Sequence, residues 1–218
     1  MNVTQLFSQS IFKLMLTAIV VSLSVNGFVV LANLLAVSKH GTDVLLSLSA
    51  FAGMPLMFAF LASPFLLVGM FWKRFRGKSL RLLLFAVIYL AIGVGCHRAA
   101  FQIRRSAFSE LALRSRPLVT AIHQFEGKYG KPPESLSQLS PEFLPQVPQT
   151  GIRAYPDYRY EAVTERDRYE GNPWVITVRA PTGVMNWDQF IYFPKQNYPE
   201  VGYGGVIERV EDWAYVHE

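Results

Sequence analysis

The chain has 218 residues, of which 51% are hydrophobic and 17% are charged, and its formal net charge is +5. The charge is uneven, since residues 1–105 carry ten basic residues and one acidic residue, whereas residues 106–218 carry 11 basic and 15 acidic residues. The positive excess lies beside apolar segments, where membrane topology accounts for it, and this argues against a role in nucleic-acid binding. Cys96 is the only cysteine, which excludes an intrachain disulfide and a thiolate-rich metal site.

Three apolar segments predict a transmembrane domain over residues 1–100. Residues 14–38 and 44–72 contain no charged side chain, and each exceeds the roughly 20 residues that a helix needs to cross the hydrocarbon core. The third segment, at about 80–97, is shorter, because Arg81 and Arg98 flank only 16 uncharged residues. Long arginine side chains can extend their charge to the membrane surface, so we expect three transmembrane helices.

The loop between the second and third segments predicts the orientation. Residues 73–81 hold five positive charges in nine residues, and a short loop of this kind is cytoplasmic on the positive-inside rule. We therefore expect a multi-pass protein of the cell inner (plasma) membrane, with a cytoplasmic N-terminus and an extracytoplasmic domain over residues 101–218. Arg98, Arg104 and Arg105 favour the opposite orientation, so a cytoplasmic domain tethered to the membrane stays an alternative.

Polar residues within the apolar segments predict packing between helices. Ser22, Asn26 and Asn33 fall on one helical face, which favours hydrogen bonds to a neighbouring helix. The uncharged stretches offer no acidic or basic group that an ion or substrate path would need. Pro55 and Pro64 are expected to kink the second helix.

Residues 101–218 begin with a helical pattern. Ser115 reads as an N-cap with Pro117 in the first turn, which predicts a helix start or a kink at this point of a long stalk. Apolar residues then recur at spacings of four, three and four on one helical face: Leu118, Ile122, Phe125 and Tyr129. Gly130, with two prolines close behind it, is expected to end the helix.

The remainder of this domain has the composition of an antiparallel sheet. Runs rich in aromatic and branched residues predict strands at 158–163, 174–180, 189–193 and 206–216, separated by glycine- and proline-rich turns. Apolar and polar residues alternate along 174–180, so we expect one face of the sheet to be buried. The predicted fold class is therefore a membrane α-helical anchor of three transmembrane helices plus a small α+β domain, with one long helix packed on an antiparallel sheet.

Residues 118–145 resemble part of the type II secretion pseudopilins and type IV pilin-like proteins. The resemblance is carried by the apolar helix face, the turn Tyr129-Gly-Lys-Pro-Pro133, and Leu136-x-x-Leu139 ahead of the strands. It extends over roughly residues 101–160 and implies a pilin-like headpiece. The family's N-terminal prepilin signature is absent from the sequence, so the resemblance implies the headpiece fold rather than assembly into a pilus.

No catalytic, cofactor-binding or metal-binding motif stands out, and we expect a protein without enzymatic activity. The four histidines are scattered, and none has the spacing of a zinc helix. Asp188 and Asp212 lie in the acidic last third, where a calcium ion bound by loop carboxylates is an alternative to a solvated charged edge. The resemblance also implies this alternative, since some pseudopilins hold calcium in a late loop.

The aromatic residues of the domain are expected to form most of its core. Trp187, Tyr198 and Tyr203 lie near predicted loops, so they are candidates for an interaction surface that binds a peptide or glycan. Taken together, these features predict an integral inner-membrane protein that presents an extracytoplasmic domain for binding or assembly. Its expected partners are the lipid bilayer and another envelope or membrane protein, with self-association left open.

The alternative function is a membrane-bound enzyme or an accessory subunit of a transport or secretion complex. The enzyme version predicts a pocket in which Asp188, Glu211 or His217 converge.

Overall fold

A computed structural model describes residues 3–42, 44–164, 168–183 and 186–217 of the chain. The chain divides into two compact units. The first consists of Met1–Leu34 and Val44–Gln102, and the second of Leu35–Asp43 and Ile103–Glu218.

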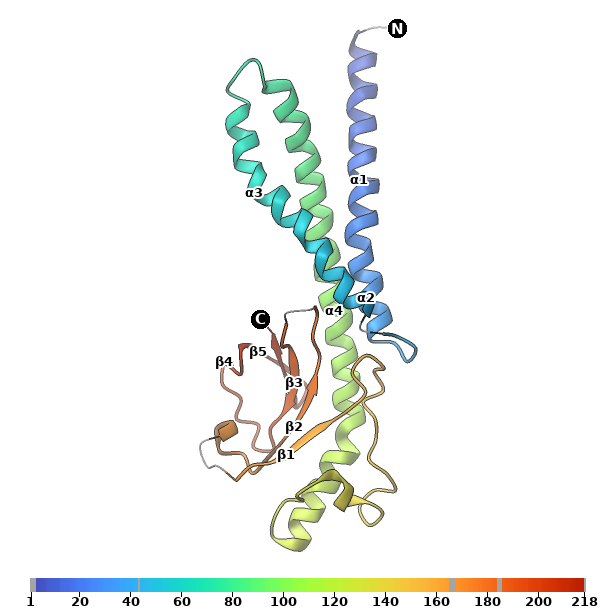
Figure 1. The fold of residues 1–218 in the computed structure, drawn as a ribbon, viewed down its shortest axis with the longest axis vertical. Coiled ribbons are helices and arrows are strands. Elements are labelled where there is room, and N and C mark those ends of the chain that lie inside the picture. The colour runs from blue at the N-terminus through green and yellow to red at the C-terminus, as the bar shows by residue number, and fades with distance from the viewer. Residues whose placement is uncertain (1–2, 43, 165–167, 184–185, 218) are drawn as a thin grey trace. The chain divides into compact units, whose positions relative to one another are not determined.

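The first unit is helical. Its elements are α1 (Val3–Ala36), α2 (Val44–Ser49), the 3-10 turn η1 (Ala50–Ala52), α3 (Gly53–Gly69) and the first half of α4 (Arg76–Tyr129) (Figure 1). Among the described residues, three helical stretches are long and apolar enough to cross a membrane by length and composition. They are Gln9–Ala36, Val44–Gly69 and the 54-residue Arg76–Tyr129. The sequence-based prediction of three long apolar helices is therefore confirmed.

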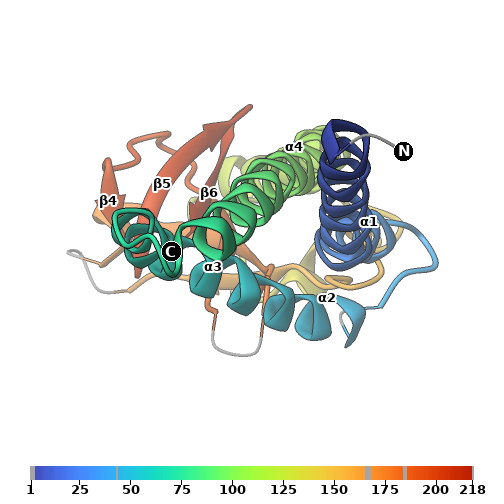
Figure 2. The ribbon, with the colours of Figure 1, turned by 90° about the horizontal axis from the view of Figure 1, so that it is seen from above.

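The helices of the first unit pack through small and polar residues. The expected hydrogen bond to a neighbouring helix is made by Ser22, whereas the amides of Asn26 and Asn33 donate to carbonyls of α1 itself. Ser22 and Asn26 of α1 are fully buried, and the Ser22 hydroxyl donates a 3.2 Å hydrogen bond to the backbone carbonyl of Tyr89 in α4. An ideal Cβ placed on Gly93 of α4 would lie 2.2 Å from a methyl of Leu56 in α3 and 3.2 Å from Asn26 Oδ1. Gly93 therefore allows α1 and α3, which flank this part of α4, to approach it closely (Figures 1 and 2).

The two prolines of the second apolar segment have different effects. The helix is interrupted by the 3-10 turn Ala50–Ala52, and Pro55 lacks the N–H that would have bonded to the carbonyl of Phe51 within this turn. Pro64 lies inside the continuous helix α3. There the hydroxyl of Ser63 donates a 2.7 Å bond to the carbonyl of Phe60, which is the acceptor that Pro64 leaves without a backbone donor.

Helix α4 runs without a break into the second unit and ends at Tyr129. The prediction of an N-cap at Ser115 is therefore wrong. The Ser115 hydroxyl instead donates to the carbonyl of Ala112 (2.7 Å) and accepts a 3.0 Å hydrogen bond from the indole N–H of Trp213. The predicted end of the helix is confirmed, because Gly130 adopts a left-handed φ of 70° and its N–H bonds to the carbonyl of Glu126 at 2.8 Å.

A six-stranded sheet follows the helix, preceded by the 3-10 turn η2 (Leu136–Leu139). Its strands are β1 (Arg159–Ala162), β2 (Trp174–Arg179), β3 (Gln189–Tyr192), β4 (Val201–Gly202), β5 (Gly205–Val210) and β6 (Trp213–His217), with the short turn η3 (Arg168–Gly171) between β1 and β2. The spatial order is β1-β2-β3-β6-β5-β4, and each pair of neighbours is antiparallel. In Figure 1 the sheet lies alongside residues 103–129 of α4.

The single strand expected at 206–216 is wrong, because this segment forms the hairpin of β5 and β6. Val210 pairs with Trp213, so only Glu211 and Asp212 form the loop. Glu211 reaches this turn with a φ of 58°, a left-handed conformation that a glutamate rarely adopts. The hairpin places β6 between β3 and β5, in the interior of the sheet.

Both faces of the sheet are covered. Towards α4, the predicted alternation along β2 is confirmed, since Trp174, Ile176 and Val178 are fully buried. On the other face a second cluster is also buried, although the alternation predicts only one buried face. Its members are Val175, Ile191, Phe193, Ala214 and Val216, with Val163, Tyr169, Tyr198, Tyr203 and Ile207 packed against them. Tyrosines from the loops thus shield the face that α4 does not reach.

Candidate functional site

Asp188 belongs to a buried polar network rather than to an exposed acidic edge. It is 4% exposed, its Oδ1 accepts a 2.8 Å hydrogen bond from the amide of Asn186, and its Oδ2 accepts one from the hydroxyl of Tyr215. The same hydroxyl accepts a hydrogen bond from Arg104 Nη2 at 3.3 Å. One phenol therefore connects a buried cation to a buried carboxylate.

The guanidinium of Arg104 is the centre of this network. Arg104 is 3% exposed, and it donates further hydrogen bonds to the hydroxyl of Tyr155 (2.8 Å) and to the backbone carbonyl of Ala180 (2.6 Å). It also lies 5.3–5.7 Å from the ring centroids of Phe108, Tyr155 and Tyr215, within cation–π range. These partners come from α4, β6 and two loops, so the network ties the helix to the sheet.

Electrostatics keep the Tyr215 hydroxyl protonated. Burial raises the pKa of Tyr215 above its usual value, and the carboxylate of Asp188 raises the pKa further, whereas the guanidinium of Arg104 lowers it. A protonated phenol can donate to Asp188 and accept from Arg104 at the same time. With its oxygens engaged in this way, Asp188 acts as a structural acceptor in this network.

The second acidic candidate, Asp212, lies in the β5–β6 loop. Its backbone carbonyl accepts a 2.9 Å hydrogen bond from the hydroxyl of Tyr198, and its side-chain Oδ1 is buried. Among the described residues, no group of three or more His, Cys, Asp or Glu side chains is arranged to hold a metal ion.

Of the three aromatic candidates, two lie together at a groove. Trp187 is 68% exposed, and it lines a cavity of about 360 Å³ together with Tyr203, Arg179, Asp188 and Gln189. This groove presents an aromatic surface beside charged and amide side chains, which suits an extended polar ligand such as a peptide.

The ring of Tyr203 is held in place by two other aromatic rings. It stacks on Tyr169 with ring centroids 5.8 Å apart and meets Phe193 edge-on at 5.6 Å. Partial burial, with Glu170 close to its hydroxyl, raises the pKa of Tyr203 to about 12. Tyr203 is thus a fixed, protonated wall of the groove at neutral pH.

Tyr198 does not belong to this groove. Its ring stacks on Phe193 with centroids 4.9 Å apart, and its hydroxyl accepts a 2.8 Å bond from the N–H of the same residue. Tyr198 is therefore part of the cluster that covers the second face of the sheet.

The residues that the enzyme alternative requires do not meet in the groove. Glu211 accepts a 2.8 Å hydrogen bond from Ser109, and His217 Nε2 lies 4.0 Å from a carboxylate oxygen of Glu208. Neither Glu211 nor His217 lines the cavity beside Asp188.

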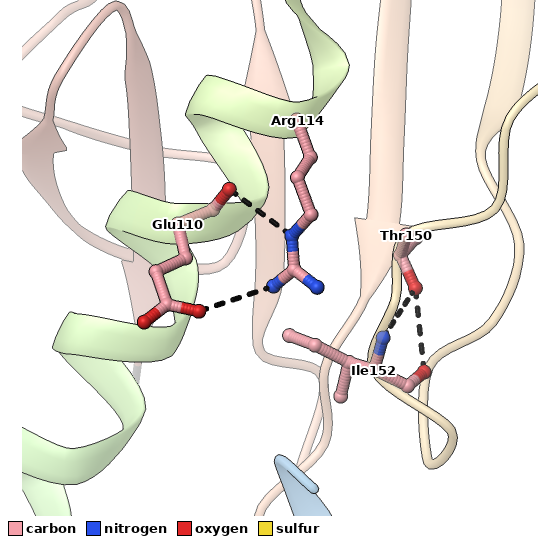
Figure 3. Close-up of polar contacts among 4 residues, drawn as sticks. All are labelled: Glu110, Arg114, Thr150 and Ile152. Atoms are coloured by element: carbon pink, nitrogen blue, oxygen red, sulfur yellow. Dashed lines mark hydrogen bonds and ion pairs between the residues drawn. The ribbon is translucent and has the colours of Figure 1, made fainter. Parts of the chain in front are cut away.

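A second cavity of the same unit, of about 570 Å³, lies at the loop that precedes Tyr155. Its lining residues are Lys39, Gln149, Gly151, Ile152, Arg153 and Pro156. The loop is closed by the Thr150 hydroxyl, which accepts a 3.1 Å bond from the N–H of Ile152, and Arg114 of α4 approaches the loop from the helix side (Figure 3). Arg114 Nε bonds to the carbonyl of Glu110 at 3.2 Å, and Nη2 lies 3.6 Å from the Glu110 carboxylate.

Sequence reasoning missed the burial of Arg104, because a charge beside an apolar segment indicates topology alone. It also missed the hydrogen bond from Arg104 to Tyr155, although the core position expected for the aromatic residues holds for Tyr155. A signal was present, since Arg104, Phe108, Leu111, Ser115, Leu118 and Ile122 recur every three or four residues and all are buried. Extending the apolar helix stripe backwards would have placed Arg104 on the core-facing side. No protein-family model, no curated protein and no solved structure matches this chain.

Proposed function

We propose that the chain is an integral protein of the inner (plasma) membrane that presents its α+β domain for binding another membrane or envelope protein, without catalysis. The observation that carries this proposal is the surface of the apolar helices. In α3, large apolar side chains are exposed along the helix, including Phe58 (64%), Phe60 (65%) and Phe65 (78%). Apolar surface of this extent is costly in water and is accommodated by lipid.

The charge of the loop between α3 and α4 supports an extracytoplasmic domain. Residues 73–81 carry five basic side chains, which favour the cytoplasmic side. The domain itself combines a long helix with an antiparallel sheet, and this arrangement supports a pilin-like headpiece.

The groove at Trp187 is the proposed contact for the partner protein. An exposed tryptophan loses unfavourable hydration when a partner covers it, and tryptophan is enriched among residues that dominate binding energy. Arg179 and Gln189 supply hydrogen-bond donors at the same groove. A partner segment with apolar and carboxylate or carbonyl groups fits this chemistry.

Membrane insertion and orientation are tested with one cysteine. In a Cys96→Ala background, Glu134→Cys places a thiol on the domain, at a side chain that is 75% exposed. The protein should resist alkaline extraction from membranes, and an impermeant maleimide should label it in cells whose outer permeability barrier has been opened. Alkaline extraction into the soluble fraction would overturn the membrane assignment, and labelling only after lysis of the inner membrane would overturn the orientation.

Partner binding is tested by a photo-cross-linking amino acid in place of Trp187 in living cells. We expect a discrete cross-linked product at this position, which disappears when Arg179→Glu reverses the charge at position 179 of the groove. The matched control is the same amino acid at Tyr129, an aromatic residue that is 49% exposed elsewhere in the domain. Identical products at both positions, or no product at position 187, would refute the groove as a binding surface.

A further inference from the structure

The cavity beside the loop 149–156 has a cationic lining. Lys39 and Arg153 both line it, and both side chains are exposed. None of the described residues that line it is acidic, and within the same part of the chain neither cation lies within ion-pair distance of a carboxylate. The cavity therefore presents two positive charges that are available to an anion.

A third cation, the guanidinium of Arg114, lies against the backbone of the same loop. An ideal Cβ placed on Gly151 would lie only 2.0 Å from Arg114 Nη1 and 2.9 Å from its Cζ, so the guanidinium lies against the glycine backbone. Gly151 also has a φ of 78°, which only glycine adopts without strain. Arg114 is partly balanced by Glu110, with 3.6 Å between their charged atoms, and it adds to the positive potential of the wall.

The cavity is assembled from two segments that are more than 100 residues apart. The N–H of Arg153 donates a 3.4 Å hydrogen bond to the carbonyl of Ser38, which belongs to the link between α1 and α2. The loop is fixed by Thr150, whose N–H bonds to the carbonyl of Pro156 at 3.2 Å. Backbone hydrogen bonds therefore hold Lys39 and Arg153 close to each other, although their like charges repel.

The position of Lys39 in the chain indicates where this cavity lies. Helix α1 ends at Ala36 and α2 begins at Val44, and both adjoin the long apolar stretches. If these stretches cross the membrane, which rests on the proposed function, Lys39 lies within three residues of a helix end and hence at the depth of the lipid headgroups.

We propose that this cavity binds a phosphate group, with an anionic phospholipid headgroup as the source. A lysine ammonium attracts phosphate as a point charge, and an arginine guanidinium can bind two phosphate oxygens at once. Basic pockets at the membrane surface bind the headgroups of anionic lipids for this reason. A soluble phosphate has the same chemistry, so the experiment must separate the two sources.

The test uses the full chain, purified in a neutral detergent. Native mass spectrometry measures the retention of phosphatidylglycerol relative to phosphatidylcholine, and a parallel thermal-unfolding assay measures stabilisation by inorganic phosphate. The variant is Lys39→Gln with Arg153→Gln, and the matched control is Lys131→Gln with Arg159→Gln, which removes two exposed charges elsewhere in the domain. Lys39→Arg with Arg153→Lys conserves the charge.

The wild type, the matched control and the charge-conserving variant should prefer phosphatidylglycerol. The Lys39→Gln, Arg153→Gln variant should lose this preference by roughly tenfold or more, because it removes both cations that would face the phosphate group. Stabilisation by inorganic phosphate that depends on the same two residues, without a lipid preference, would support the phosphate site and overturn the lipid source.

An unchanged lipid preference and phosphate response in the Lys39→Gln, Arg153→Gln variant would overturn the site, as would an equal loss in the matched control. Alkaline extraction of the same membranes separates this failure from failure of the proposed function. A protein that stays in the membrane but shows no dependence on Lys39 and Arg153 refutes only the phosphate site.

Discussion

Replacing Tyr215 with phenylalanine tests whether the buried network holds the helix and sheet together. The change removes one hydroxyl, which donates to Asp188 and accepts from Arg104, and it keeps the ring that contacts Phe108 at a centroid distance of 5.0 Å. A hydrogen bond to a charged group contributes about 1.5–3 kcal/mol, and Asp188 retains only part of its hydrogen bonding. We therefore expect Tyr215→Phe to lower the free energy of unfolding by about 2–3 kcal/mol.

The assay is thermal unfolding of the full chain in detergent, followed by tryptophan fluorescence, since Trp174 and Trp213 are buried in the domain. A domain of this size should lose roughly 6–15 °C in melting temperature. The matched control is Tyr158→Phe, because the Tyr158 hydroxyl is buried without a hydrogen-bond partner among the described residues, so its removal should be neutral or stabilising. The reasoning is refuted if Tyr215→Phe costs no more than Tyr158→Phe.

Gly93→Val should lower the melting temperature of the full chain, because the Cβ of the new side chain would lie 2.2 Å from Leu56. Gly95→Val is the control and should not lower it, because nothing lies within 4 Å of a Cβ at that position. Equal melting temperatures of the two variants would contradict the close helix packing. Termination after Val210 removes β6 from between β3 and β5, so limited proteolysis should digest the domain, and a resistant domain fragment would show the sheet to be independent of β6. Burial raises the pKa of Tyr158 from 10.0 to about 12, so the unfolded chain loses its proton first and stability is lost as pH rises through this range. Alkaline unfolding of Tyr158→Phe should therefore be less steep than that of the wild type between these pH values, and a parallel dependence would contradict the buried phenol.

The sequence was sufficient for features that depend on local chemistry. The long apolar helices follow from uninterrupted hydrophobic runs, and the end of α4 follows from Gly130, which takes the left-handed conformation. The alternation along β2 likewise identified the residues that face α4.

Features that depend on distant partners were not predictable in this way. Ser115 and Pro117 carry the local pattern of a helix start, but α4 is continuous, and the Ser115 hydroxyl bonds to Trp213, which lies 98 residues away. The β5–β6 hairpin was missed because Glu211 and Asp212 lack the usual turn composition, and Glu211 is held in a left-handed conformation by the surrounding pairs.

The buried network at Arg104 and the cavity at Lys39 were also not predictable from the sequence, because both depend on distant partners. Arg104 is a charged residue close to a predicted membrane segment, which locally indicates topology alone. Its burial requires oxygens from Tyr155, Ala180 and Tyr215, and these lie 51–111 residues further along the chain. The cavity at Lys39 and Arg153 likewise depends on a backbone hydrogen bond between Ser38 and Arg153.

The interior position of β6 has a consequence for biosynthesis. In the sheet, β6 lies between β3 and β5 and pairs with both, so the sheet cannot be completed until the ribosome has added Trp213–His217. At about 5–20 residues per second, the sheet then remains incomplete for roughly 5–20 s after the last apolar helix has been made. A nascent chain that cannot complete its sheet early can still be threaded through a narrow channel, as the extracytoplasmic location proposed above for the domain would require.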